Sequence, residues 1–436
     1  MTVMRTAGST RFRTTGRRAV VGGAAGSVLL LASACGTAGS VGGGGSAGES
    51  GGYEYGASQD EINEAIADLE PVNIVYQVGT PSANSTTGAR SLQFKDAVEE
   101  MSNGQIEVEI VWSMAVAGYP EAIDAVVDGR VDVSYHLVGY EPQRFPEATA
   151  LATALANVEY SPMVGEMVAH GVASEIGWNS EPLLDRFEQE GVRPLAPFIA
   201  NGAYSLNCNS QIATGDDLEG RQIRAGTSGQ SQAVQDFGAV PTSMEFTEAF
   251  EAMQRGTIDC DLSPTAAKDI SGVFQAAPHL SYTTEASWPR FPAGFFVGSS
   301  FDNLPVAYQQ ILFDSADLLV SGSAQGYVDS NKNHVEDIRS VDGTINEFDS
   351  AMQDELREIV DSQIETNIDD GLVPEDIVES IAELEEKYRG IVTELGYEDG
   401  GDMETMDEWY DPAADWSDYS DAIFEEAGAL DHRPGS

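Results

Sequence analysis

The sequence predicts an α/β fold made of two similar lobes, each built on a mainly parallel sheet. Residues 121–132 and 248–259 share Glu, Ala, Ala, Gly and Asp in register, which indicates an internal repeat. Each copy is itself a helix, a tight turn and a strand, and it is preceded in the chain by a strand, a helix and a strand. A length of 436 residues suffices for two lobes of about 150 residues with additional segments. A crevice between two such lobes suits a small ligand.

The first lobe is predicted over residues 71–199. Apolar residues indicate strands at 72–78 and 106–110, and between them an i, i+3, i+4, i+7 pattern indicates a helix that contains Phe94, Ala97, Val98 and Met101. The first repeat copy then adds a helix, a glycine C-cap and a further strand. This order of elements is typical of an α/β lobe.

The second lobe is predicted over residues 200–300, and the chain crosses back near the end of this range. Its pattern is a short strand at 222–225, a helix at 229–237 and a strand at 239–244, followed by the second repeat copy. The order of elements therefore matches that of the first lobe.

The character of the sequence changes after residue 300. Apolar residues at spacings of three and four predict long helices over residues 301–400, which brace both lobes. Residues 401–436 form an acidic tail rich in aromatic residues. Partial disorder and packing on the surface both remain open for this tail.

The N-terminus resembles an export signal. The first 34 residues contain five arginines and no acidic residue, and an apolar run of small residues follows over 20–34. The run ends in Ala-Ser-Ala-Cys-Gly, which resembles a bacterial lipobox and makes residues 1–35 a lipoprotein signal peptide with Cys35 as the lipid anchor. An ordinary secretory signal with an incidental cysteine is the alternative. The pair Arg17 and Arg18 leaves the general secretory and twin-arginine routes open.

Residues 36–70 form a flexible Gly/Ser tether with an acidic lead-in, which would hold a domain away from a membrane. Beyond the signal, no apolar run approaches the roughly 20 residues of a spanning helix. Contact with a membrane is therefore expected through the lipid alone.

The chain is strongly acidic, with a formal net charge of −50 and only four lysines. Such a charge excludes nucleic acid as a partner. Acidic residues spread along the whole chain favour a surface adapted to high salt, and a merely acidic protein is the alternative. An anionic ligand would need positive charge supplied locally, so each arginine is informative.

The sequence contains no constellation typical of an enzyme, and it predicts no catalytic residue, cofactor or metal. The histidines lack metal-ligand spacing, and no phosphate loop, nucleophile elbow or Cys-x-x-Cys motif is present. Beyond the signal only Cys208 and Cys260 remain. In an exported protein they form either one disulfide or a free buried pair.

Several segments together resemble the substrate-binding proteins of tripartite ATP-independent periplasmic (TRAP) transporters, of the C4-dicarboxylate-binding type. The resemblance covers about residues 71–396 and is carried by the order and spacing of segments 94–108, 145–147, 217–224, 237–248 and 258–259. It implies a type II periplasmic-binding-protein-like fold with a hinge, a long helix that spans both lobes and closure around a carboxylate. It also implies delivery to the small and large membrane subunits of a permease.

The resemblance also implies residues for the ligand site. Arg224 matches the arginine that clamps the ligand carboxylate, a task that suits a planar guanidinium. Tyr204 stands where many members have a second arginine, and Ser263 stands where many have Asn. Phe246 matches an aromatic residue of the pocket wall, with core packing as the alternative. A single arginine fits a monocarboxylate at least as well as a dicarboxylate.

Four further residues are candidates from their own positions. Arg290 could supply a second cation, and Trp288 lies in a Pro-flanked segment that favours a stacking role over core packing. Gln77 and His136 end strands of the first lobe and could donate hydrogen bonds, although a core position is equally expected for His136.

The sequence therefore predicts an extracytoplasmic solute-binding lipoprotein, anchored to the outer face of the cytoplasmic membrane, that captures a small organic acid for a permease. The alternatives are a sensor component that uses the same fold and an extracellular hydrolase of unrecognised type. The identity of the acid, the coupling ion and the oligomeric state remain open.

Overall fold

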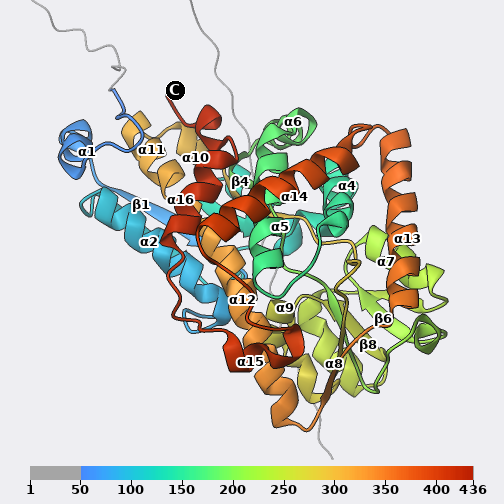
Figure 1. The fold of residues 1–436 in the computed structure, drawn as a ribbon. Helices are drawn as coiled ribbons and strands as arrows, with labels where there is room; N and C mark the ends of the chain where they lie inside the picture. Colours follow the sequence, from blue (N-terminus) through green and yellow to red (C-terminus); the bar gives the residue numbers. More distant parts are fainter. Residues whose placement is uncertain (1–50, 436) are drawn as a thin grey trace, which may run out of the picture. The chain divides into compact units, whose positions relative to one another are not determined.

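A computed structural model describes residues 51–435 (Figure 1). The predicted signal peptide, Cys35 and residues 36–50 of the predicted tether lie outside the described residues, whereas part of the acidic lead-in forms the helix α1 (Gln59–Ile66). The strands form two sheets, one of five strands and one of six. We refer to the elements around these sheets as the first and the second lobe.

The first sheet has the strand order β2-β1-β3-β10-β4. The strands β1, β2 and β3 are parallel, and β10 runs antiparallel to both of its neighbours, β3 and β4. Their bounds are Val72–Gln77 (β1), Ile106–Val111 (β2), Val133–His136 (β3), Arg193–Ile199 (β4) and Ala293–Val297 (β10). Because β10 joins this sheet late in the chain, the chain crosses from the first lobe to the second after β4 and returns before β10.

The second sheet has the order β11-β9-β5-β8-β6-β7. Here β8, β6 and β7 are parallel, while β5 is antiparallel to both β8 and β9. The bounds are Ser205–Cys208 (β5), Gln222–Ala225 (β6), Val240–Ser243 (β7), Cys260–Ser263 (β8), His279–Tyr282 (β9) and Thr344–Glu347 (β11). The predicted α/β class with mixed, mainly parallel sheets is confirmed.

The internal repeat is confirmed as a structural repeat. Helices α3 (Ala122–Val127) and α8 (Ala249–Gln254) each end before a glycine with positive φ, Gly129 at 71° and Gly256 at 68°. A left-handed residue closes a helix at little cost only when it lacks a Cβ atom. The two glycines therefore turn the chain into β3 and β8, one strand in each sheet.

Helices cover the sheet of the first lobe. Helix α2 buries Phe94 and Val98, two residues of the predicted apolar face, whereas α5 is buried almost all round because β4, α12 and α14 all pack against it. Besides α3, the first-lobe helices are α1 (Gln59–Ile66), α2 (Ala89–Met101), α4 (Pro146–Ala154), α5 (Val164–Asn179), α6 (Glu181–Gln189), α10 (Ser299–Asp302) and α11 (Val306–Asp314).

Two further helices belong to the second lobe, α7 (Ser228–Asp236) and α9 (Thr265–Ser271). Thr227 caps α7 by accepting a hydrogen bond from the Gln230 backbone N–H. This cap starts the helix directly after β6, at the strand end where Arg224 lies.

The longest helix is α12 (Asp317–Ser340), whose 24 residues span about 36 Å. It packs against α2 and α5 of the first lobe and against α9 and β11 of the second (Figure 1). This is the lobe-spanning helix that the resemblance implied.

The C-terminal part is helical: α13 (Ser350–Asp369), α14 (Ile377–Glu394), α15 (Met406–Trp409) and α16 (Ser417–Glu426). The acidic tail packs on the protein, since α15 and α16 both contact α12 and Tyr419 is buried. Packing, rather than disorder, is therefore the state of this tail in the structure.

One strand within the predicted helical region was not expected. Strand β11 is only four residues long and pairs in parallel with β9 at the edge of the second sheet. A four-residue edge strand between α12 and α13 is too short to produce a detectable apolar alternation.

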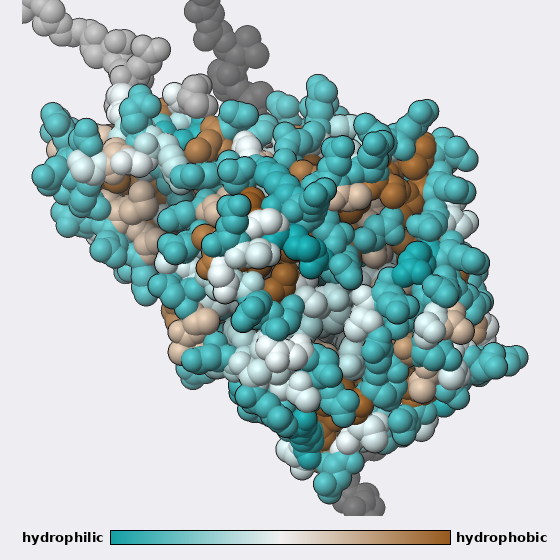
Figure 2. All heavy atoms as spheres, in the orientation of Figure 1, coloured by the Kyte–Doolittle hydropathy of each residue, from teal (hydrophilic) through white to brown (hydrophobic). Residues whose placement is uncertain are grey.

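The face shown in Figure 2 is covered mainly by hydrophilic residues, with apolar residues in small patches. No helix within residues 51–435 is long and apolar enough to cross a membrane.

Candidate ligand-binding site

A cavity of about 50 Å³ lies between side chains of the two lobes. The first lobe contributes Gly79, Thr80, Thr87, Arg90, Tyr119, Tyr135, Leu137 and Tyr140. The second lobe contributes Tyr204, Arg224, Phe246, Ser263, Pro264, Ala266, Ala267 and Ile270, while Asn201, Phe291 and Tyr327 come from the crossing segments and α12.

Arg224 ends β6 and lies at the cavity with only 2% of its surface exposed. Its Nε donates to the Met244 carbonyl (3.1 Å), and its Nη1 donates to the Leu262 carbonyl (3.1 Å). Its Nη2 lies 3.4 Å from the Tyr140 hydroxyl. These contacts fix the guanidinium plane in advance of binding, which lowers the entropy cost of bidentate recognition.

Tyrosine hydroxyls dominate the polar surface of the cavity. Burial raises the pKa of Tyr119, Tyr135, Tyr140, Tyr204 and Tyr327 above the ordinary value of a phenol. These side chains are therefore neutral at physiological pH. All five offer aromatic faces to a bound molecule, and the hydroxyls of Tyr119, Tyr140 and Tyr204 can also donate hydrogen bonds.

Asn201 connects the first crossing segment, residues 200–204 between β4 and β5, to the cavity wall. Its Oδ1 accepts a hydrogen bond from the Tyr135 hydroxyl (3.0 Å) and another from the Tyr327 hydroxyl. Asn201 and Gly202 have φ values of 54° and 71°, and a Cβ atom on Gly202 would lie 2.6 Å from the Tyr327 ring. The first crossing segment thus makes a tight left-handed turn that only glycine permits at position 202.

The structure brings four of the predicted site residues to this cavity: Arg224, Tyr204, Phe246 and Ser263. Phe246 packs near Tyr119, with ring centres 6.4 Å apart. Ser263 ends β8, and its hydroxyl donates to Asp261 at 2.5 Å. These residues come from three strand ends of the second sheet and from the first crossing segment.

Trp288 and Arg290 lie outside the cavity lining. Both are buried in the second crossing segment, where Trp288 packs against Phe237 with ring centres 5.7 Å apart. Arg290 forms a buried ion pair with Glu166, and its Nη1 lies 3.2 Å from the carboxylate. The Pro-flanked segment is therefore a packed connection between the lobes. Its Phe291 lines the cavity, whereas Trp288 and Arg290 do not.

Gln77 and His136 also lie outside the lining. The Gln77 side-chain oxygen accepts hydrogen bonds from the Val116 and Ala117 backbone N–H groups, both at 2.9 Å. His136 Nε2 lies 3.1 Å from a Glu141 oxygen, and burial lowers the pKa of the imidazole. Both side chains hold first-lobe loops in place, which agrees with the core position that was open for His136.

Arg90 is the lining residue that the sequence analysis missed most clearly. It lies at the start of α2, is buried, and its Nη1 donates to the Ser323 hydroxyl of α12 at 3.0 Å. The scarcity of basic residues made every arginine a candidate for binding an anion, and Arg90 is one of these few arginines. No local pattern, however, marks the start of α2 as part of a cavity.

The two cysteines within residues 51–435 are joined. Cys208 and Cys260 are register partners in the antiparallel pair of β5 and β8 and form a disulfide. Both are fully buried. The bond ties the central strands of the second sheet together beneath the cavity residues of β8.

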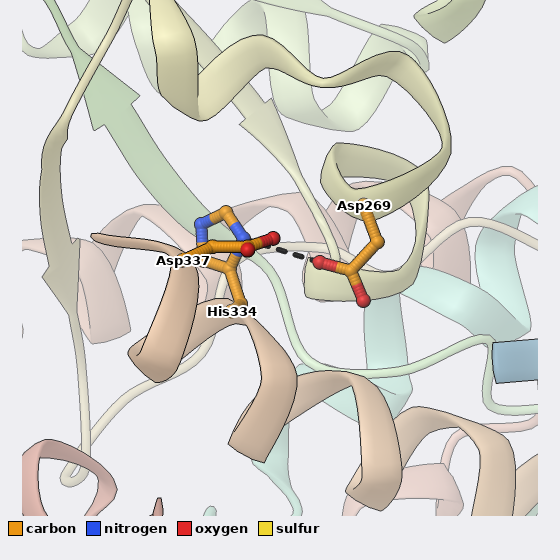
Figure 3. Close-up of side chains that lie close together, drawn as sticks. All are labelled: Asp269, His334 and Asp337. Carbon is orange, nitrogen blue, oxygen red and sulfur yellow. Dashed lines mark hydrogen bonds and ion pairs between the residues drawn. The ribbon is translucent and has the colours of Figure 1, made fainter. Parts of the chain in front are cut away.

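A separate cluster joins α9 to α12 (Figure 3). The ligand-type atoms of Asp269, His334 and Asp337 all lie within 4.8 Å of one another, so the three residues could hold a cation. The sequence analysis did not predict this cluster, although the i, i+3 spacing of His334 and Asp337 on one helix places these two side chains on one face.

The hydrogen bonds assign protons within the cluster without a metal. The Asn207 amide NH₂ faces the Ala277 carbonyl (2.9 Å), so the Asn207 oxygen accepts from His334 Nε2 (3.0 Å). Burial raises the pKa of Asp269 to about 8 and lowers the pKa of His334 to about 3. At neutral pH the Asp269 carboxyl therefore carries a proton and donates it to His334 Nδ1 across 3.3 Å.

Comparison with known proteins identifies the family. The family model for bacterial extracellular solute-binding proteins, family 7, matches residues 78–368, which is more than half of the chain. A solute-binding protein of Verminephrobacter eiseniae is 29% identical over 236 residues, or 53% of this chain and 67% of that protein. The alignment therefore spans about two thirds of that relative's length.

Solved structures share the fold. The sugar acid binding protein DctPAm of Advenella mimigardefordensis, in complex with galactonate, has a TM-score of 0.61 at 20% identity and covers 74% of this chain and 100% of its own. A marine metagenome TRAP solute-binding protein, in complex with 3-hydroxybenzoate, has a TM-score of 0.63 at 20% identity and covers 73% and 99%. The two-lobed type II fold is thereby confirmed.

These findings favour a binding component of a transporter over the sensor and the hydrolase that the sequence left open. They confirm the resemblance to TRAP solute-binding proteins. The chain belongs to the bacterial extracellular solute-binding protein family 7.

Proposed function

We propose that this protein captures a small organic acid outside the cytoplasm and that Arg224 binds the carboxylate. The observation that carries the proposal is the preset guanidinium of Arg224 at an interlobe cavity whose lining includes no Asp or Glu. Galactonate and 3-hydroxybenzoate, the ligands in the two solved structures, each carry one carboxylate. An arginine and several tyrosine hydroxyls suit a ligand that combines a carboxylate with hydroxyl or aromatic groups.

Binding and delivery follow from the two-lobed architecture. The anion meets Arg224 in the second lobe, and the lobes then close over it because the ligand binds the closed state more tightly than the open one. Tyr204, Phe246 and Ser263 line the cavity beside Arg224 and complete the second-lobe half of the site. The closed protein then docks on the small and large membrane subunits of a TRAP permease.

The N-terminal residues support a lipid anchor as a further part of the proposal. Cys35 follows an apolar run and precedes a Gly/Ser-rich tether, an arrangement that resembles a processed lipoprotein. The mature domain would then work at the outer face of the cytoplasmic membrane. Mass spectrometry of the exported protein tests this: lipidation at Cys35 and its loss in Cys35→Ser are expected, and an unmodified N-terminus downstream of Cys35 contradicts it.

The strongly negative charge supports work in a salty medium, where screening shortens the repulsion between surface carboxylates. Screening also shortens the unfavourable field that an anionic ligand meets on approach. We therefore expect folding and binding to strengthen between low and molar salt.

The decisive experiment measures ligand-dependent thermal stability of the mature domain in high salt. A panel of mono- and dicarboxylates, with galactonate and 3-hydroxybenzoate included, is tested against the wild type, Arg224→Ala and Arg255→Ala. A ligand at 100 times its dissociation constant adds about 2.7 kcal/mol of stability. Stabilisation by an acid that Arg224→Ala loses and Arg255→Ala, an exposed control, retains supports the proposal. No stabilisation by any carboxylate overturns it.

A further inference from the structure

The cavity contains a second arginine whose charge no carboxylate of the protein balances. Arg90 is 3% exposed, and none of the ion pairs among residues 51–435 includes it. Its guanidinium donates from Nη1 to the Ser323 hydroxyl and also hydrogen-bonds the neutral Tyr135 hydroxyl, while Nε has no hydrogen-bond partner among the described residues. A buried guanidinium with so few partners is costly unless an anion joins it.

The surroundings of Arg90 are aromatic. Its guanidinium carbon lies 4.6 Å from the centre of the Tyr135 ring and 5.3 Å from that of Phe295. The titratable groups that act on it most strongly are the hydroxyls of Tyr135, Tyr327, Tyr76 and Tyr119. These phenols are neutral at physiological pH, because burial raises their pKa values. The positive charge of Arg90 is therefore left uncompensated next to the cavity.

Arg224 differs in this respect. Asp261, which is also buried, lies behind it with one carboxylate oxygen 3.9 Å from Arg224 Nη1. The partly exposed Glu245 adds negative charge on the same side. Arg224 thus has a buried carboxylate beside it, which it shares with the buried Lys268, whose pKa burial lowers to about 7. Within the described part of the chain, Arg90 has no such carboxylate.

This charge balance determines what the cavity accepts. Among residues 51–435, Arg90 and Arg224 are the only charged residues in the cavity lining, and Asp261 lies beside the second of them. We propose that Arg90 in the first lobe is a second anion-binding residue, that it neutralises the ligand's single carboxylate, and that the site selects monoanionic acids over dianionic ones. This inference rests on the proposed function and adds to it the net charge that a substrate carries, which is −1.

The arrangement also explains why binding would close the lobes. Arg90 is carried by α2 and held by Ser323 of the lobe-spanning helix, whereas Arg224 is carried by β6 of the second lobe. A carboxylate between them is attracted to both lobes at once. Both arginines can attract the carboxylate only when the two lobes are together. The ligand therefore binds the closed state more tightly than the open state, and this difference in affinity drives closure.

The test uses matched pairs of acids on the mature domain: butyrate against succinate and benzoate against phthalate. It is carried out at pH 8, where every carboxyl group of the four acids is ionised. Calorimetric affinities are measured for the wild type, Arg90→Gln, Asp261→Asn and the exposed control Arg255→Gln. We expect the wild type to bind the monoanion of a pair at least tenfold more tightly than the dianion. Arg90→Gln should weaken monoanion binding at least tenfold, and Arg255→Gln should bind as the wild type does.

Asp261→Asn provides an independent test, because it leaves Arg224 uncompensated and should shift the preference of the cavity toward the dianion. Arg90→Gln should also raise the melting temperature of the ligand-free domain, because it removes an unpaired buried charge. Weaker binding together with a raised melting temperature is therefore lost recognition and not a folding defect. Equal binding by Arg90→Gln and wild type, or a dianion preference in the wild type, overturns the inference alone. Failure of every acid to bind the wild type overturns the proposed function and this inference with it.

Discussion

The Tyr140 hydroxyl accepts hydrogen bonds from Arg224 Nη2 and from the Phe246 backbone N–H, each at 3.4 Å. Tyr140 follows β3 of the first lobe, whereas Arg224 and Phe246 belong to the second. One phenol oxygen therefore bridges the two lobes beside the cavity. The contact can form only while the two lobes lie together at this place.

Tyr140→Phe should weaken binding of a stabilising acid by about threefold to tenfold. The variant keeps the packing of the ring on Phe291, whose centre lies 4.7 Å away, and removes only the bridging hydroxyl. A hydrogen bond of this kind contributes about 1 kcal/mol. Calorimetry with the acid identified for the wild type gives the affinity, and Tyr55→Phe serves as an exposed control. Unchanged affinity in Tyr140→Phe contradicts a role of the bridge in closure.

The pair of Glu166 and Arg290 holds the two crossing segments together. Glu166 lies on α5, and its other carboxylate oxygen accepts a hydrogen bond from the Ala203 backbone N–H at 2.6 Å. Ala203 belongs to the first crossing segment and Arg290 to the second. Loss of one partner leaves the other charge buried and alone, so Glu166→Gln and Arg290→Met should each lower the free energy of unfolding by about 3 kcal/mol or more.

The double variant Glu166→Gln, Arg290→Met should lose less stability than the sum of the two single losses, because neither buried charge remains. Urea denaturation of the four proteins gives the coupling. Strictly additive losses would mean that the two residues act independently of each other. Binding of the acid should weaken less than stability, since neither side chain reaches the cavity.

The architecture followed from the sequence because local patterns carry it. The repeat, its two glycines and the strand patterns of β1, β2, β6 and β7 all depend on residues close together in the chain. Arg224 was found through the resemblance and through its place at a strand end. These signals survive in a single sequence because helix caps, turns and strand periodicity are local.

The rest of the site depends on tertiary placement that no local pattern encodes. Arg90 reaches the cavity because α2 packs on α12, a helix more than 200 residues later in the chain. Trp288 was predicted to stack on a ligand because prolines flank it, and Arg290 to supply a second cation. The crossing segment that contains both lies under α4 and α5, where Arg290 donates its backbone N–H to the Ala152 carbonyl and pairs with Glu166. A proline-rich segment indicates irregular backbone, and only packing decides whether its side chains face a ligand.

The disulfide between Cys208 and Cys260 should contribute about 4 kcal/mol to stability. The cysteines are 52 residues apart, and closing a loop of that length restricts the unfolded chain by about this amount in the loop-entropy model. Denaturation of Cys208→Ala, Cys260→Ala should show a lower midpoint than that of the wild type without reductant. A wild type reduced under denaturing conditions should approach the variant, and equal midpoints in all three samples would contradict a stabilising role.

Asp269 should make the stability of the protein depend on pH in a predictable direction. Burial raises its pKa from an ordinary 3.8 to about 8, so the native protein holds a proton there that the unfolded chain releases in this range. The stability from the protonated carboxyl is full below pH 3.8 and is lost as the pH rises toward 8. Asp269→Asn keeps a neutral donor toward His334 Nδ1 and cannot ionise.

The variant should therefore match the wild type near pH 5 and exceed its free energy of unfolding by more than about 1 kcal/mol at pH 8.5. Burial lowers the pKa of His334 to about 3, so protonation of this residue in the unfolded chain reduces the free energy of unfolding below pH 6.5. This contribution is present in both proteins and cancels when they are compared. Urea denaturation at the two pH values measures the difference, with the exposed Asp96→Asn as a control for simple charge removal. A constant difference between variant and wild type at both pH values would mean that Asp269 is ionised throughout, and that the proton between Asp269 and His334 resides on the imidazole.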